Sequence, residues 1–186
     1  MEPADITAGR LHLRPFRAAD ADVVLRACQD PDIQRWTSVP SPYLARHARS
    51  WVTSVAPAGW SSGRAATFAV LDSTCGDLLA SVGLDRISPT ERSAELGYWC
   101  APWARGQGVM TQAAAAACRW GFGAPDAGGL GLGLIEWRAE VGNDASRRVA
   151  EKVGFRIEGT LRLRAVHQGR RVDCWVGSLL LEEILG

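Results

Sequence analysis

Hydrophobic and polar residues recur along this chain with two different periods. Segments with a period near two predict strands, and segments whose apolar residues recur every three or four positions predict helices. Prolines and glycines mark most of the boundaries, so that Pro31 is expected to end the first helix and Pro57 the second. The pattern predicts strands at residues 10–16, 65–71, 78–87, 93–100, 134–139, 155–163 and 172–181, and helices at residues 20–30, 44–55, 106–122 and 144–153.

The order of these elements predicts an α/β fold with a mixed sheet. The three strands between residues 65 and 100 follow one another through short turns, so we expect them to pair as an antiparallel meander. The later strands alternate with helices. Because no repeat or linker divides the sequence, residues 1–186 are expected to form a single domain.

Composition narrows the class of protein. The chain is 47% hydrophobic and 22% charged with a net charge of +1, which is typical of a globular protein and offers no basic patch for nucleic acid. It lacks a signal-peptide pattern and an apolar run of about 18 residues, so no membrane partner is expected. Five cysteines without a C-x-x-C pair argue against a disulfide framework or a metal site and favour the cytoplasm. Cys100 is the one expected near an active cleft.

A glycine-rich turn follows the strand at residues 93–100. Arg105-Gly106-Gln107-Gly108 leads directly into a predicted helix, whose first backbone N–H groups and dipole would attract a phosphate. Arg105 would add a charge-assisted contact. The same residues also fit a tight turn without a ligand. They match neither the P-loop nor the dinucleotide-binding fingerprint.

A second segment, from Asn143 to Phe155, reads N-x-x-S…E-K-x-G-F. Taken alone it predicts a helix capped by Asp144 and ended by Gly154. Together, the two segments resemble the GNAT acetyltransferase superfamily, in which the first matches the pyrophosphate motif [RQ]-x-x-G-x-[GA]. The phrases A-E-L-G-Y-W (residues 94–99) and L-R-P-F (residues 13–16) resemble its ribosomal-protein-alanine N-acetyltransferase branch. Met110 departs from the motif, because a glycine or alanine usually stands there.

The resemblance implies a mainly antiparallel sheet flanked by helices, with a V-shaped cleft between the strand ending at Cys100 and the strand at residues 134–139. The co-substrate would be acetyl-CoA or another acyl-CoA. Its pantetheine arm would lie in the cleft and its diphosphate on the amides that begin the next helix. The residues implied in binding coenzyme A are Tyr98, Trp99, Cys100, Arg105, Gly106, Gln107, Gly108, Val109, Met110, Thr111, Asn143 and Ser146.

The resemblance also implies direct attack of an amine on the thioester, which requires a base and a proton donor. Glu95 lies on a mostly apolar central strand, where a carboxylate is costly unless it is paired or used. It is therefore either the base or half of an ion pair with an arginine. Many family members use a tyrosine as the acid, but Ala150 occupies that position here. Ser146 is the replacement candidate, and it also fits a cap-region serine.

The acceptor side of this family is shaped by the first two helices and the loop between them. Trp36 and Tyr43 are the residues expected to bind the acceptor, in a region that also offers Trp51 and Trp60, while His47 is expected on the surface. Aromatic walls suit the amine of a peptide or protein N-terminus, or of a small molecule. Arginines near the cleft would also suit succinyl-CoA.

The expected function is therefore an acyl-CoA-dependent N-acyltransferase. The alternatives are a non-catalytic acyl-CoA-binding or regulatory module, and a nucleotide-binding protein that uses the glycine-rich turn for ATP. The apolar last strand, residues 172–181, would suit a sheet that continues across a homodimer.

Overall fold

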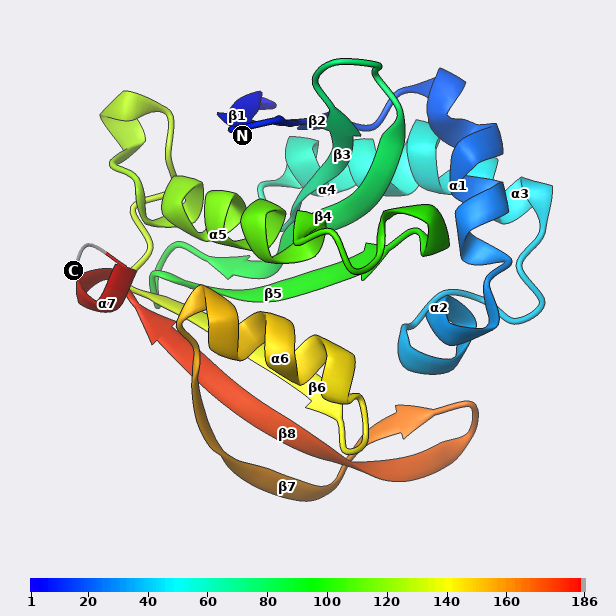
Figure 1. Ribbon diagram of the computed structural model, residues 1–186. Helices are drawn as coiled ribbons and strands as arrows, with labels where there is room; N and C mark the ends of the chain where they lie inside the picture. The colour runs from blue at the N-terminus through cyan, green and yellow to red at the C-terminus, as the bar shows by residue number, and fades with distance from the viewer. Residues whose placement is uncertain (185–186) are drawn as a thin grey trace.

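An eight-stranded mixed sheet runs through the computed structural model in the order β1-β2-β3-β4-β5-β6-β8-β7 (Figure 1). The structure describes residues 1–184, so the last two residues of the expected domain lie outside the described part. The strands are β1 (Ile6–Ala8), β2 (Leu11–Pro15), β3 (Ala66–Asp72), β4 (Leu78–Ser88), β5 (Ser93–Cys100), β6 (Leu134–Glu140), β7 (Arg156–His167) and β8 (Arg170–Leu180).

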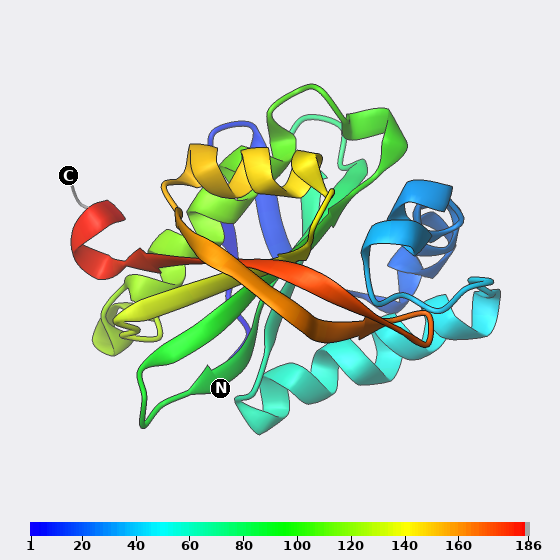
Figure 2. The ribbon, with the colours of Figure 1, turned by 90° about the horizontal axis from the view of Figure 1, so that it is seen from below.

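Within residues 1–184, seven α-helices cover the sheet or connect its strands. They are α1 (Ala21–Cys28), α2 (Pro31–Trp36), α3 (Ala45–Ser50), α4 (Ala56–Ser62), α5 (Val109–Phe122), α6 (Asp144–Val153) and α7 (Leu181–Ile184). A π-helical segment, Trp51–Val55, joins α3 to α4. Helix α6 and the α3–α4 segment lie on opposite sides of the sheet (Figure 2).

Two hydrophobic clusters occupy the two faces of the sheet. Phe68, Val82 and Leu96 pack against α5 on one face. The other face carries Ala69 beneath Val24 and Val52 of the α1–α4 region. Because neighbouring residues of a strand point to opposite faces, the alternating strands supply both clusters at once.

Pairing in the sheet is antiparallel except between β5 and β6. The expected meander of β3, β4 and β5 is thus confirmed. The parallel pairing joins Ser93–Leu96 to Leu134–Trp137 and goes no further in the described chain, although both strands continue. The two strands separate towards their C-terminal ends, which confirms the V-shaped arrangement (Figure 1).

Three details of the sequence prediction are wrong near the N-terminal helices. Strand β1 and helix α2 were absent from it, and the second helix continues beyond Pro57 to Ser62. Pro31 begins α2 instead of only ending α1, because Asp30 caps the new helix by accepting a hydrogen bond from the Ile33 N–H (3.0 Å). The π-helical turn before α4 changes the hydrogen-bond pattern where Pro57 lacks a donor.

A buried ion pair joins β2 to the start of α1. The Arg14 guanidinium donates two hydrogen bonds of 2.8 Å to Asp20, and both side chains are less than a tenth exposed. Asp20 also accepts from the Arg17 N–H at 2.7 Å. Burial alone would raise the pKa of Asp20, but these hydrogen bonds outweigh it and hold that pKa below its usual value.

We predict that Asp20→Asn lowers the free energy of unfolding by about 3–5 kcal/mol at pH 7, because it leaves the Arg14 charge buried and unpaired. Since the pKa of Asp20 is lowered by folding, its stabilisation is present above the unfolded pKa of about 3.9 and is lost as pH falls through the folded pKa. Urea unfolding at pH 7 and below pH 4 measures both effects. Asp22→Asn, on the exposed side of α1, is the control, and equal losses in the two variants would contradict the prediction.

Candidate active site

The turn before α5 presents open backbone. Gly106 and Gly108 both adopt left-handed conformations, with φ of 75° and 74°, and a Cβ built on either would meet no atom within 4 Å. The first hydrogen bond of the helix runs from the Gln112 N–H to the Gly108 carbonyl (3.1 Å). Earlier N–H groups have no helical acceptor, so the turn can bind an anion at the positive end of the helix.

Side chains of this segment do not all face the same way. Val109 and Met110 are buried in the core, so either would reach a ligand only through its backbone N–H. The departure of Met110 from the family motif is therefore absorbed by packing. The helix predicted from residue 106 begins at Val109, because Gly108 has a left-handed φ.

Arg105 forms ion pairs with two aspartates that are distant from it in the sequence. Its guanidinium contacts Asp30 at 2.5 Å and Asp32 at 3.2 Å, at the start of α2. Burial would raise the pKa of Asp30, but Arg105 and the α2 amides hold it below the usual value. The Gln107 side chain is also held in place, because it accepts a hydrogen bond from Arg10 and donates one to the Trp103 carbonyl. The assignment of both residues to a diphosphate stays a prediction.

The start of α6 positions Ser146 between the two separating strands. Asn143 caps the helix, in place of the predicted Asp144, by accepting from the Ser146 N–H at 3.2 Å. The Ser146 hydroxyl accepts from Trp137 Nε1 of β6 (3.2 Å) and lies 3.0 Å from the Tyr98 hydroxyl of β5. Sequence reasoning missed Trp137, because no motif marks a residue whose role depends on pairing between strands.

Tyr98 determines what the Ser146 hydroxyl can do. Burial raises the pKa of Tyr98 to about 12, so its hydroxyl keeps its proton at neutral pH. That one hydrogen can go to the Ser146 carbonyl or to the Ser146 hydroxyl, which both lie 3.0 Å away. When it goes to the hydroxyl, Ser146 accepts two hydrogen bonds and its own hydrogen is free to be donated elsewhere.

The end of β5 carries Trp99 and Cys100. The backbone of this stretch has no partner on the β6 side within the described chain. Burial raises the pKa of the Cys100 thiol, so it stays protonated and weakly reactive at neutral pH. The stretch therefore offers hydrogen-bonding backbone and not a nucleophile.

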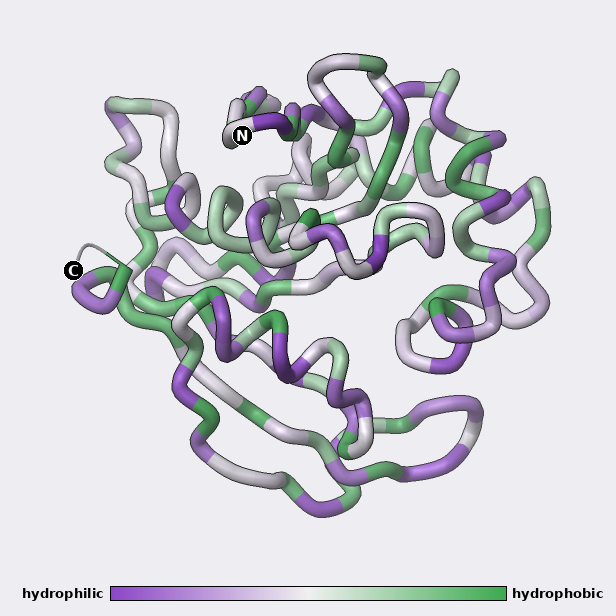
Figure 3. The backbone as a smooth tube through the Cα atoms, in the orientation of Figure 1, coloured by the Kyte–Doolittle hydropathy of each residue, from purple (hydrophilic) through white to green (hydrophobic). Residues whose placement is uncertain are grey.

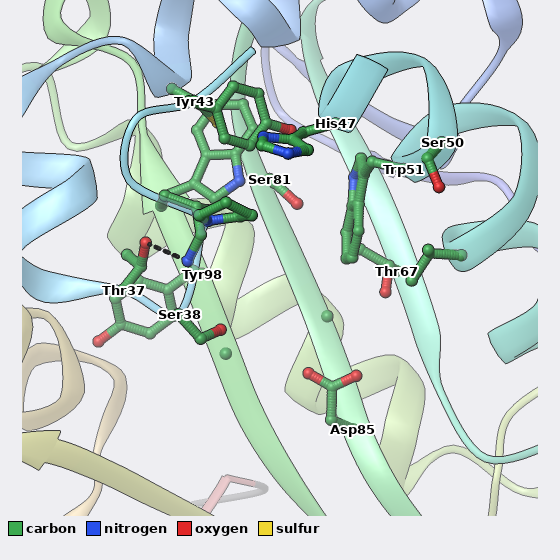
Figure 4. A pocket seen from close by; sticks show the side chains of 17 residues that line it. Thr37, Ser38, Tyr43, His47, Ser50, Trp51, Thr67, Ser81, Asp85 and Tyr98 are labelled. Carbon is green, nitrogen blue, oxygen red and sulfur yellow. Dashed lines mark hydrogen bonds between the residues drawn. The ribbon is translucent and has the colours of Figure 1, made fainter. Parts of the chain in front are cut away.

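A pocket of about 370 Å³ opens between β3–β5 and the segment from α2 to α3 (Figure 4). Tyr43, Trp51 and Trp99 line it, and the role of Tyr43 in acceptor binding stays a prediction. His47 also lines it, half-buried against Tyr43, so its predicted surface position is wrong. Its Nδ1 accepts a hydrogen bond from the Leu44 N–H at 3.1 Å.

Two of the expected aromatic residues lie elsewhere. Trp36 is not among the residues that line the pocket, and its ring packs beneath the Arg35 guanidinium at 4.1 Å. Trp60 belongs to the core, where it packs on Phe68 and Trp120. Trp60 lies on α4, beyond the helix predicted at residues 44–55, and the left-handed Gly63 ends α4.

Two carboxylates lie opposite each other on neighbouring strands, and one of them, Asp85, lines the pocket. Asp85 and Glu95 are register partners on β4 and β5. Glu95 Oε2 lies 3.3 Å from Arg86 and 3.6 Å from Arg138. Glu95 therefore forms the ion pair with an arginine that was the alternative to a role as base, and it still stands beside Asp85. Asp85 lines the pocket, and sequence reasoning missed it. The only local sequence signal for Asp85 was its position as a charged residue directly after the apolar run 78–84.

The separating strands, the open turn before α5 and the pocket together define an N-acyltransferase of the coenzyme A-dependent class. Residues 10–156 match the family described as the acetyltransferase (GNAT) domain, and the chain belongs to that family. It is an acyl-CoA-dependent N-acetyltransferase, and nothing among the comparisons supports the alternative of a non-catalytic module.

Three relatives illustrate the similarity. The uncharacterized N-acetyltransferase p20 of Bacillus licheniformis is 26% identical over 95% of this chain and 96% of its own length. The ribosomal-protein-serine acetyltransferase of Escherichia coli K12 is 34% identical over 46% of this chain and 45% of its own. The solved structure of Mycobacterium smegmatis RimJ in complex with CoA-disulfide has a TM-score of 0.82 at 24% identity, covering 98% of this chain and 91% of that one.

Metal sites and membrane-spanning helices are both absent from residues 1–184. No group of three or more His, Cys, Asp or Glu side chains in this part of the chain is arranged to hold a metal ion. Its helices are all too short or too polar to cross a membrane.

Gly108→Ala is predicted to weaken coenzyme A binding about tenfold, because a side chain disfavours the left-handed backbone by about 1–2 kcal/mol and would reorient the amides at the helix start. Isothermal titration with coenzyme A measures the affinity. Gly63→Ala, at a similarly left-handed glycine with equally open space, is the matched control that should lose stability but keep affinity. Unchanged affinity in Gly108→Ala would disprove a role for these amides.

Proposed function

We propose that this enzyme transfers the acetyl group of acetyl-CoA to the α-amine of a peptide or protein N-terminus. One observation carries the proposal: the acidic end of the pocket and the Ser146 hydroxyl approach the same unpaired stretch of β5. An amine bound in the pocket would thus meet a thioester held along that strand.

The residues for the donor fit its parts. The amides of residues 106–111 suit a diphosphate. The unpaired β5 edge from Gly97 to Cys100 suits the amide groups of a pantetheine arm, which would pair with it as an added strand does. Asn143 stands at the start of α6, beside Ser146.

An acetyl donor is favoured over succinyl by the state of the arginines. Arg35 is bound to Glu140, Arg105 to Asp30, and Arg138 to the two glutamates Glu95 and Glu136. A succinyl carboxylate would have to displace one of these partners. The charges near the cleft are already balanced without it.

Different groups of this chain would perform the separate steps of acetyl transfer. Acyl-CoA supplies a thioester whose carbon bonds to the amine nitrogen while the carbon–sulfur bond breaks and its electron pair leaves with sulfur. A carboxylate of the Asp85–Glu95 pair takes the proton that the ammonium must lose. The Ser146 hydroxyl donates a hydrogen bond to the leaving sulfur, and a backbone N–H near Trp99 stabilises the developing charge on oxygen.

The acceptor class follows from the strength of such a base. An α-amine has a pKa of about 7.7–8.0, against about 10.4 for a lysine side chain, so a carboxylate can deprotonate it far more readily. The similarity to a ribosomal-protein-serine acetyltransferase supports a protein N-terminus. Five free cysteines support a cytoplasmic setting.

Ser146→Ala should lower kcat about 10- to 100-fold and leave the affinity for coenzyme A nearly unchanged, because its hydrogen bond to sulfur forms only as the thiolate develops. Thiol release from acetyl-CoA with a peptide, corrected for peptide-free blanks, gives kcat. Mass spectrometry then locates the acetyl group on the α-nitrogen.

Ser61→Ala, a helical serine on the far side of the fold, is the matched control. Full kcat in Ser146→Ala would reduce Ser146 to a structural residue at the helix start. Coenzyme A binding without any peptide-dependent thiol release would refute the proposed function itself.

A further inference from the structure

The pocket has an apolar body and one acidic end. Figure 4 shows Asp85 at one end and Tyr43 with His47 at the other. Val39, Trp51 and Val55 contribute to the walls between them. Asp85 is the only acidic residue among the described residues that line the pocket. Such a shape suits a ligand with a single positive charge attached to an apolar group.

Asp85 differs from its neighbour Glu95 in having no partner. Glu95 is held by Arg86 and Arg138. Within residues 1–184, Asp85 makes no salt bridge and no side-chain hydrogen bond. Asp85 has no arginine partners like those of Glu95, so a cationic ligand that binds its carboxylate would not have to displace one.

The direction of Asp85 links the pocket to the cleft. Its Oδ2 lies 3.4 Å from the point where a Cβ on Gly97 would stand. Gly97 is the first residue of β5 beyond the pairing with β6. The absence of a side chain at Gly97 therefore lets the carboxylate approach the part of the strand where the thioester is expected.

The electrostatic surroundings of Asp85 also favour its acting as a base. Asp85 is exposed to solvent as a residue, although protein atoms crowd its carboxyl. Desolvation by these atoms and the charge of Glu95 raise its pKa, while Arg86 opposes the rise. The other titratable groups of the pocket are Cys28 and Tyr43, whose pKa values burial raises, with His47 and Tyr98. The raised pKa makes Asp85 a stronger base, and within residues 1–184 no salt bridge occupies its carboxylate.

We propose that Asp85 binds the ammonium of the acceptor and takes its proton, and that the pocket accepts a large apolar first side chain. The preferred acceptors are then N-termini that begin with residues such as leucine or phenylalanine. This inference rests on the proposed function. One proton passes from the ammonium nitrogen to Asp85 Oδ, and the freed lone pair forms the bond to the acetyl carbon as the carbon–sulfur bond breaks. The second proton that this nitrogen loses goes to the departing thiolate, which leaves as the free thiol of coenzyme A. Glu95 acts through Asp85, as a positioning residue.

The test uses the full-length enzyme, acetyl-CoA and four peptides that differ only in the first residue, which is leucine, phenylalanine, serine or aspartate. We expect kcat/KM for the leucine and phenylalanine peptides to exceed that for the serine peptide at least tenfold. Asp85→Asn should lower kcat/KM for the leucine peptide at least 100-fold. Its coenzyme A affinity and melting temperature should stay close to those of the unmodified enzyme, which shows that it folds.

Two further variants sharpen the result. Val55→Asp, at a rim position that is 51% exposed and tolerant of charge, should reduce the leucine preference without unfolding the chain. Asp126→Asn, on an exposed turn, should change nothing. Serine or aspartate peptides acetylated as well as the leucine peptide would overturn the pocket's preference, and an active Asp85→Asn would overturn its role. Failure of the proposed function looks different, because then no peptide α-amine reacts in any variant.

Discussion

The early end of the pairing between β5 and β6 is the feature on which the site depends. Four register pairs hold the strands together, and beyond Leu96 and Trp137 they separate. Backbone that would otherwise bond across the sheet is left free on β5, and a polar side chain is needed to span the gap. Ser146 does so, because it contacts Tyr98 on one strand and Trp137 on the other. Under the proposed function, this fork is both the opening for the thioester and the frame that positions the Ser146 hydroxyl.

Two sets of ion pairs fix the helices on the acceptor side, and one of them joins these helices to the glycine-rich turn. Arg14 and Asp20 fix the entry to α1, whereas Arg105 crosses from the glycine-rich turn to Asp30 and Asp32 at the start of α2. Removing one partner of the buried pair costs far more than removing one of the exposed pair, because the remaining charge stays buried, whereas water screens Arg105. An anion at the turn would share the Arg105 guanidinium with those aspartates. The position of α2, and with it that of Thr37 and Ser38 in the pocket wall, is thus connected to the turn proposed to bind the donor.

Local patterns predicted most of the fold and the donor side of the site. Alternation along 65–100 and the glycines at 106 and 108 act over a few residues, so the sequence shows them directly. Helix α2 has only six residues and depends on the Asp30 cap, and the π-helical turn before Pro57 depends on packing. Trp137 and Asp85 were missed for a related reason. Their importance comes from which residue of another strand lies opposite, and strand register between distant segments leaves no local trace.

The two carboxylates show why register matters more than motif here. Glu95 stands inside the phrase that resembles the family, so sequence reasoning selects it as the base. Asp85 lies opposite on β4, outside any motif, yet it faces the pocket and lacks the arginines that hold Glu95. Glu95 already has two guanidinium groups as partners, so an ammonium would have to compete with them for its carboxylate. The residue that completes the pair from the neighbouring strand is the better base, and Glu95 contributes by keeping a negative charge beside it.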